Sequence, residues 1–320
     1  MTRIGGLGRA AWLCVIALIA LAAPAAAQQR RIALSFDDVP RAAGAFMTPQ
    51  ERTTRLIAGL KQAGVDQAAF FVTPGRLDAA DGRDGAKHVA AYAAAGHVIA
   101  NHSFGHRRLT GVEVDAYLSD IDRAEAWLKN RPGYRGWFRF PFLDEGGKDK
   151  VKRDAVRAGL GARGLTNAYV TVDGSDWNLE TLTVQAVAAG KTIDMPALKQ
   201  LYVETMVEAA NFYDDVARRA LGRSPAHVIL LHETDLAALY VVDLVDALRQ
   251  HGWTIISADD AYADAIAAIE PDVPSAQGPR SELIAWERGI PPPRWYDRNT
   301  IHIADRLFAE RVLHETEVQP

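Results

Sequence analysis

Short apolar runs alternate with longer helical patterns over most of this sequence. Seven runs rich in apolar, β-branched or aromatic residues lie at 32–36, 68–72, 97–101, 137–140, 168–172, 227–231 and 253–257. Between them, apolar residues recur three and four positions apart, as they do on one face of a helix. Runs of this length that alternate with helical stretches are typical of βα units around a parallel sheet. We therefore predict an α/β fold with seven strands.

Two of the helical stretches are especially regular. One covers 114–128 and the other covers 198–216. The second has Pro196 near its expected start and Gly222 just beyond its expected end, which are the positions that proline and glycine favour at helix boundaries.

Polar clusters lie at the ends of five of the seven expected strands. They are Asp37-Asp38, His102 to His106, Arg139 with Pro141-Phe142, Asp173 to Trp177, and His232-Glu233. In a closed βα barrel the carboxyl ends of the strands share one face, and active sites are built on that face. The convergence of five clusters there indicates a site more strongly than any single motif does.

His102 and His106 form a candidate metal-binding pair. On a helical turn, a spacing of four places both imidazoles on one side, and an aspartate from the first strand would complete a set of two histidines and one carboxylate. Taken alone the pair is a weak signal that fits capping or buried histidines better, and the nearby Asp37-Asp38 is what favours a metal site. Asp37 and Asp38 cannot point the same way, so one can bind the metal while the other acts as a base. Their segment, Asp-Asp-Val-Pro, is also compatible with a simple turn.

Arg139 and His232 are candidate partners of this centre. Arg139 lies in an otherwise apolar strand, where a guanidinium is costly unless it pairs with a carboxylate; a purely structural salt bridge would satisfy the same argument. His232 follows a rigid apolar strand and titrates near neutrality, which suits a general acid. Asp176 is a candidate to orient it through the other ring nitrogen. The histidines predicted to be structural or surface residues are His88, His97, His227 and His251.

Residues 1–27 are predicted to be a secretory signal peptide. Arg3 and Arg9 precede an uncharged apolar run, and residues 25–27 offer small side chains for cleavage. The uncharged stretch 10–27 just reaches the roughly 18 residues that a membrane span needs, so an uncleaved membrane anchor is the alternative. We expect a periplasmic or secreted protein with no stable membrane insertion after cleavage.

The mature chain would contain no cysteine, because the single cysteine is Cys14. Loss of Arg3 and Arg9 takes Lys+Arg from 36 to 34 against 40 acidic residues, a net charge of −6. This mildly acidic balance argues against a nucleic-acid partner. An exported chain without disulfides depends on its core or on a metal, and any such metal must be held by nitrogen and oxygen ligands.

Residues 271–320 are predicted to be an extension that follows a catalytic domain at 28–270. Prolines become frequent in it, with three in a row at 291–293. Trp286, Trp295 and Tyr296 are interspersed among them. We expect these aromatics to pack the extension against the barrel; a partner surface is the alternative.

Taken in order, the five clusters resemble the five motifs of the polysaccharide deacetylases, carbohydrate esterase family four. The matching segments are Ser35-Phe36-Asp37-Asp38, His102-Ser103-x-x-His106, Arg139-x-Pro141-Phe142, Asp173-x-x-Asp176-Trp177 and Leu230-x-His232. The resemblance covers residues 31–260. It implies a distorted (β/α)7 barrel, similar to a TIM barrel, and this agrees with the seven strands counted independently.

The resemblance also implies a role for each residue. Asp37 would be the general base and would pair with Arg139. A divalent metal, usually zinc in this family, would be held by Asp38, His102 and His106.

The remaining motif residues would complete the chemistry. His232 would protonate the leaving amine, with Asp176 orienting it. The backbone N–H of Phe142 would help to stabilise the oxyanion, and Trp177 and Leu230 would line the acetyl pocket. Elementary chemistry agrees, because a metal polarises the amide carbonyl and acidifies its water while a base and an acid complete the hydrolysis.

Several features depart from the family pattern. Val39 stands where glycine is common, and Phe142 stands where tyrosine is common, which removes a hydroxyl but keeps the backbone donor. The stretch 178–225 is longer than a compact family core needs, and the tail after residue 270 is additional. These departures weaken the case for a chitin-like substrate.

The sequence therefore favours a metal-dependent hydrolase that removes N-acetyl groups from an amino-sugar glycan. Hydrolysis of O-acetyl groups on xylan, or of another small C–N bond such as a formamide or cyclic amide, would use the same site. A glycan-binding protein on a retired catalytic scaffold is the alternative from another class. The presence of both an acid and a base argues against it.

Overall fold

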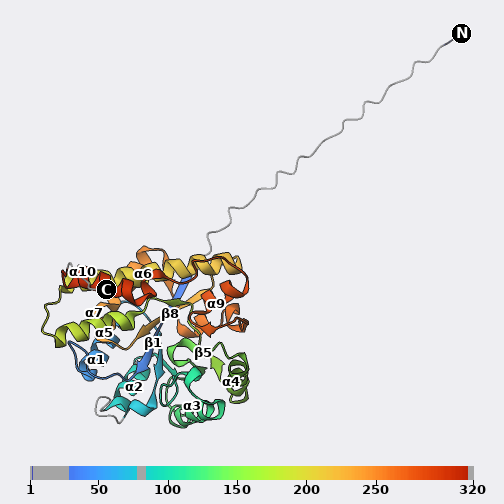
Figure 1. The fold of residues 1–320 in the computed structure, drawn as a ribbon, viewed down its shortest axis with the longest axis horizontal. Coiled ribbons are helices and arrows are strands. Elements are labelled where there is room, and N and C mark those ends of the chain that lie inside the picture. The colour runs from blue at the N-terminus through green and yellow to red at the C-terminus, as the bar shows by residue number, and fades with distance from the viewer. Residues whose placement is uncertain (1, 3–28, 78–83, 316–320) are drawn as a thin grey trace.

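The computed structural model describes residues 2, 29–77 and 84–315. It shows a curled, parallel sheet surrounded by helices (Figure 1). The predicted signal peptide, apart from residue 2, lies outside the described residues, and so does Cys14. In the described ranges, no helix is both long and apolar enough to cross a membrane.

The main sheet is organised around one long strand. Its strands are β1 (Arg30–Val39), β2 (Ala69–Val72), β3 (Val98–Asn101), β4 (Tyr134–Phe138), β6 (Thr166–Asn167), β7 (Val172–Asp173), β8 (Ala226–His232) and β9 (Trp253–Ile255). One edge of β1 pairs with β8, and the other edge pairs with β9 near its start and with β2 near its end. Every pairing in this sheet is parallel, so the carboxyl ends of the strands lie together.

The segment predicted as a strand at 168–172 is divided between two neighbours, so this prediction was wrong in position. β6 pairs with β4, and β7 pairs with β8. Between them the chain crosses from one edge to the other: the N–H of Ala168 donates to the carbonyl of Phe138 (2.8 Å), and that of Thr171 donates to the carbonyl of Val228 (3.0 Å). Residues 166–173 thus link the two edges of the curled sheet, although β6 and β7 do not pair with each other, and the predicted distorted (β/α)7 barrel is confirmed.

β4 is shifted toward the N-terminus relative to the prediction of 137–140. Phe140 instead precedes a short 3₁₀ turn at Pro141–Leu143. Pro141 has no backbone N–H and cannot extend a ladder, which ends the strand there.

Helices connect the strands and cover the outside of the barrel. They are α1 (Pro49–Gln62), α2 (Gly85–Ala94), α3 (Val114–Leu128), α4 (Lys150–Ala162), α5 (Asp176–Ala188), α6 (Met195–Leu221), α7 (Asp235–Gln250) and α8 (Ala258–Tyr262). The helices predicted at 114–128 and 198–216 are confirmed as α3 and α6. Pro196 lies in the first turn of α6, and Gly222 ends it in a left-handed conformation (φ 72°). The long stretch 178–225 is largely α5 and α6.

The side chains of β1 point alternately into two apolar cores. Ile32, Leu34 and Phe36 belong to a large cluster beneath the outer helices, whereas Ala33 belongs to a smaller cluster with residues of β8. Successive side chains of a strand point to opposite faces. Asp37 therefore follows Ala33 on the inner face of the barrel, at the carboxyl end of a buried strand.

Residues beyond 270 add one small sheet and two helices. β10 (Ala276–Gln277) pairs antiparallel with β5 (Asp144–Gly147), and α9 (Arg280–Glu287) and α10 (Ile301–Val312) follow. Tyr296 is buried, with its ring centroid 5.9 Å from that of Phe212 in α6, whereas Trp295 stays 39% exposed. The aromatic packing expected of Tyr296 is present, while the domain boundary at residue 270 stays a prediction.

Candidate active site

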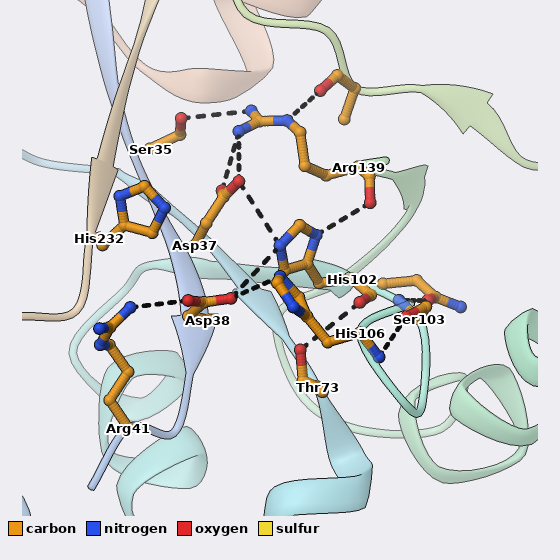
Figure 2. A network of polar contacts seen from close by, with 12 residues as sticks. Ser35, Asp37, Asp38, Arg41, Thr73, His102, Ser103, His106, Arg139 and His232 are labelled. Atoms are coloured by element: carbon orange, nitrogen blue, oxygen red, sulfur yellow. Dashed lines mark hydrogen bonds and ion pairs between the residues drawn. The ribbon is translucent and has the colours of Figure 1, made fainter. Parts of the chain in front are cut away.

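The candidate residues lie together at the carboxyl ends of the strands (Figure 2). Asp37 and Asp38 are near the end of β1, and His232 is the last residue of β8. His102 follows β3 directly, and Arg139 follows β4. Five side chains from four segments of the sequence are thus carried by β1, β3, β4 and β8 to one mouth of the barrel.

The two adjacent aspartates point in different directions, as predicted. Asp37 is still extended and lies opposite His232 in the β1–β8 register. Asp38 has a left-handed backbone (φ 70°), which an aspartate tolerates better than most residues do. Figure 2 shows the result: Asp37 faces Arg139, and Asp38 faces the histidines of the β3 loop and Arg41.

Arg139 is buried and fully engaged. Its Nη1 donates to both carboxylate oxygens of Asp37 (2.8 and 3.0 Å), and its Nη2 donates to Ser35 Oγ (3.2 Å) and to the Tyr262 hydroxyl (2.9 Å). Its Nε donates to the carbonyl of Ala168 in the segment that connects β6 to β7. Burial raises the pKa of Asp37, and the opposite charge of Arg139 opposes that shift. The salt bridge therefore fixes the orientation of Asp37 as well as compensating its charge.

His102 and His106 are brought together by a loop, so the helical turn expected between them is wrong. Ser103 and His106 both have left-handed backbones (φ 61° and 51°), which reverse the chain twice. Side chains hold this shape: Ser103 Oγ accepts from the N–H of His106 (2.9 Å), and Asp120 accepts from the N–H groups of residues 104 and 105 (both 2.9 Å). The two rings end with their centroids 4.9 Å apart.

Asp38, His102 and His106 form a set of donors that fits a divalent metal ion. One ligand atom from each lies within 4.8 Å of the others, and Nε2 of His106 is 2.8 Å from Asp38 Oδ1. Nδ1 of His102 lies 2.9 Å from the carbonyl of Arg139. A carbonyl only accepts, so Nδ1 carries the proton and Nε2 presents its lone pair to the site. Nitrogen and oxygen donors arranged in this way suit zinc and similar ions.

Two arginines that the sequence analysis did not single out also contact this centre. Nη1 of Arg41 donates to Asp38 Oδ2 (2.6 Å), and Nη1 of Arg76 lies 3.4 Å from Asp38 Oδ1. Arg76 is the first charged residue after β2, and all strands of a barrel end at the same face. The polar residue after β2 could therefore have been predicted to face the site, like the clusters after the other five strands.

His232 and Asp176 form a second pair. Nδ1 of His232 lies 2.7 Å from Asp176 Oδ1, and the His232 backbone N–H donates to Oδ2 (2.8 Å). Burial lowers the pKa of His232, but the charge and hydrogen bond of Asp176 outweigh this and raise it above 6.5. Asp173, three residues earlier, has its pKa raised to about 6 by burial.

The three residues expected to contact substrate differ in exposure. Leu230 is 5% exposed and shares the inner face of β8 with His232, two residues on. Trp177 is 37% exposed in the first turn of α5. Phe142 is 44% exposed, with its ring against His106 (centroids 4.6 Å apart) and beneath the Arg108 guanidinium (4.0 Å). Apolar surface therefore flanks the polar centre.

The other histidines have structural or surface settings. His227 is buried, with ring nitrogens 3.0 Å from Thr171 Oγ1 and 3.2 Å from Asp214 Oδ1. His88 and His97 are also buried, and His251 is exposed.

The fold is a βα barrel, and the candidate residues lie at the carboxyl ends of its strands. Residues 25–162 match the family model described as polysaccharide deacetylase, a range that runs from before β1 to the end of α4. The match covers less than half of the chain, and over these residues it confirms the resemblance drawn from the sequence. The enzyme class follows: this is a deacetylase-type hydrolase that acts on C–N bonds of acetylated glycans.

Solved structures with a similar fold come from several bacteria. A family 4 carbohydrate esterase from Streptomyces lividans, in complex with acetate, is 24% identical over 77% of this chain and 100% of its own, with a TM-score of 0.48. A peptidoglycan deacetylase from Bacillus subtilis is 20% identical over 73% and 90% (TM-score 0.44). A polysaccharide deacetylase from Bacillus cereus is 18% identical over 72% and 92% (TM-score 0.48). No curated protein matches the chain.

Proposed function

We propose that this protein removes acetyl groups from N-acetylated amino-sugar glycans with the help of a divalent metal ion, zinc being the best match to the donor set. The observation that carries the proposal is the grouping of Asp38, His102 and His106 within 4.8 Å, close to Asp37 of β1, whose register partner on β8 is His232. When bound, the ion would polarise the amide carbonyl and acidify a water molecule.

Asp37 would act as the general base. Its carboxylate is held by Arg139, which leaves it no freedom to rotate away from the metal-binding residues. His102 Nε2 lies 3.7 Å from Asp37 Oδ2, so the base and the metal donors face the same space. A proton taken from the attacking water would be received at this oxygen.

His232 would donate the proton that the leaving amine requires. Asp176 holds its Nδ1, so Nε2 is the nitrogen left to face the substrate. The pKa of His232 is raised above 6.5, which keeps more of the ring protonated near neutral pH. Phe142 would contribute its backbone N–H to the developing oxyanion, while Trp177 and Leu230 would line the acetyl pocket.

A signal peptide at residues 1–27 would take the protein to the periplasm or outside the cell, where N-acetylated glycans occur. The relatives from Bacillus subtilis and Bacillus cereus are described as peptidoglycan and polysaccharide deacetylases, which supports a cell-wall or related glycan as substrate.

The test is a measurement of acetate release by metal-free and zinc-reloaded protein. The panel holds N-acetylglucosamine oligomers, peptidoglycan fragments and O-acetylated xylan, with formate release measured in parallel. We expect acetate from the amino-sugar substrates in the zinc-loaded protein alone, and a loss of at least about a hundredfold in Asp37→Asn and His232→Ala. The matched control His251→Ala, an exposed histidine outside the site, should keep full activity. Release from xylan alone, or from no substrate, would contradict the proposal.

A further inference from the structure

A pocket of about 430 Å³ opens beside Asp38, on the side of the site away from Arg139. It lies between the loop after β1, the turn after β2 and helix α5. The side chains that give it its character are Arg41, Arg76, Thr181, Val184 and Gln185. Its wall thus combines two cations with a hydroxyl, an amide and an apolar surface.

The charge of this pocket is predominantly positive. Arg41 and Arg76 both converge on Asp38, at 2.6 and 3.4 Å, and their side chains are 26% and 35% exposed. One carboxylate therefore faces two guanidinium groups in addition to the two histidines. A bound divalent ion would add further positive charge at the same carboxylate.

The other charged residues of the pocket do not offset this excess. Arg52 is buried and pairs with Asp235 (3.2 Å). Glu180 is buried and accepts hydrogen bonds from the backbone N–H groups of residues 235 and 236 (3.4 and 3.1 Å). Arg41 and Arg76 are therefore the charged groups that the pocket presents to solvent.

Arg41 is held in place by a buried network. Arg52 donates to the carbonyls of Arg41 and Ala42 (both 2.7 Å), and Glu233 accepts from the backbone N–H of Arg41 (2.8 Å). Asp235 accepts from the N–H groups of residues 46 and 47 (2.7 and 2.9 Å). Burying and ordering the charged side chains of Arg52, Glu233 and Asp235 costs free energy. Here these side chains fix the backbone of the loop that carries Arg41.

We propose that this pocket is a subsite for a carboxylate carried by the substrate, on the sugar that bears the acetamido group or on its neighbour. This inference rests on the proposed function and narrows its substrate class from neutral to acidic amino-sugar glycans. Guanidinium groups match the planar carboxylate geometrically, and the side-chain amide of Gln185 adds a neutral donor. The arginines lie within 3.4 Å of a metal-binding residue, so the carboxylate they bind is only one sugar unit or less from the scissile amide.

Binding is measured by isothermal titration in the Asp37→Asn variant, so that no turnover is needed. The probes are an oligomer of alternating N-acetylglucosamine and N-acetylmuramic acid, its methyl ester, and an N-acetylglucosamine oligomer of equal length. We expect the acid to bind at least about tenfold more tightly than its ester, with a preference that falls as salt is added. Arg76→Gln should abolish the preference, whereas Arg55→Gln, an exposed arginine of α1 outside the pocket, should keep it.

Equal binding of acid and ester, no binding of either, or a preference that survives Arg76→Gln would overturn the carboxylate proposal. Acetate release by the protein with Asp37 intact is measured separately on the same three compounds. A preference without acetate release would reject the deacetylase proposal alone. Acetate release without a preference would reject the carboxylate subsite alone.

Discussion

Asp37 of β1 and His232 of β8 are register partners on neighbouring parallel strands. The residues proposed as base and acid are therefore fixed relative to each other by a backbone ladder, not by loops. Sites built on strands hold their geometry better than sites built on loops. The proposed metal ligands of the β3 loop need extra support for the same reason, and Asp120, Ser103 and the carbonyl of Arg139 provide it.

Replacing Asp176 with asparagine should lower the pKa of His232. Burial lowers this pKa, and Asp176 is what raises it above 6.5 in the native protein. A general acid works in its protonated form, which exists below its pKa, so the alkaline limb of the kcat profile should move to lower pH. NMR titration of the His232 ring measures the shift without turnover, with the exposed His251 as internal reference. An unchanged His232 titration would contradict this role of Asp176.

Replacing Arg139 with methionine should destabilise the fold strongly. It leaves the carboxylate of Asp37 buried without its partner, which costs about 3–5 kcal/mol. Arg139→Lys keeps the positive charge but not the forked guanidinium donor, so the decrease in unfolding free energy should be smaller than in Arg139→Met. The matched control is Arg163→Met, whose ion pair with Asp122 is exposed and should be worth less than about 1 kcal/mol. Urea unfolding at pH 7 makes the comparison, and equal losses in Arg139→Met and Arg163→Met would refute it.

His97 should make stability depend on pH. Burial lowers its pKa to about 4 from 6.5, and its Nδ1 accepts from the N–H of Ala68 (3.3 Å), so the native ring is neutral. The unfolded chain takes up this proton at higher pH than the folded chain. The neutral His97 ring contributes roughly 3 kcal/mol to the free energy of unfolding above pH 6.5. This contribution is lost as the pH falls to about 4.

The check is the slope of unfolding free energy against pH in that window. His97→Gln should flatten the slope whatever its stability at pH 7, while the exposed-site variant His251→Gln should not. A slope that is the same in His97→Gln as in the unmodified protein would show that another group is responsible.

Gly44→Ala should disturb the loop that carries Arg41. A Cβ atom at this position would lie 2.4 Å from the carboxylate of Asp235, which is buried and anchors the loop. We expect a loss of about 1–3 kcal/mol in thermal or urea unfolding. Gly111→Ala is the matched control, because its Cβ would have no neighbour within 4 Å. Equal stability of the two variants would contradict the tight packing of this loop.

Much of the fold was predictable because burial patterns repeat along the chain. β1, β2, β3, β8 and β9 lie where apolar runs predicted strands, since a buried parallel strand must be apolar on both faces. The run at 168–172 is equally apolar, yet its two ends pair with different neighbours. An apolar run indicates that a segment is buried, but it does not indicate which neighbouring strand the segment pairs with. The sequence therefore could not predict this division.

The candidate site was predictable where a residue type is costly to place elsewhere. A buried arginine such as Arg139 needs a carboxylate, and the structure supplies Asp37. The geometry of His102 and His106 was not predictable, because it depends on two left-handed residues held by the distant Asp120. Arg41 was missed because its contact with Asp38 depends on how the loop after β1 turns back, which the buried network around Arg52 decides.

Asp38, His102 and His106 are proposed to hold a metal ion that the hydrolysis needs. The most direct measurement is acetate release from an N-acetylated glycan oligomer while metal-free protein is titrated with zinc. We expect no release without metal, a rise with added zinc, and a plateau near one equivalent that is absent in His106→Gln. Acetate release at the same rate in metal-free and zinc-loaded protein, or none at any zinc concentration, would contradict the claim.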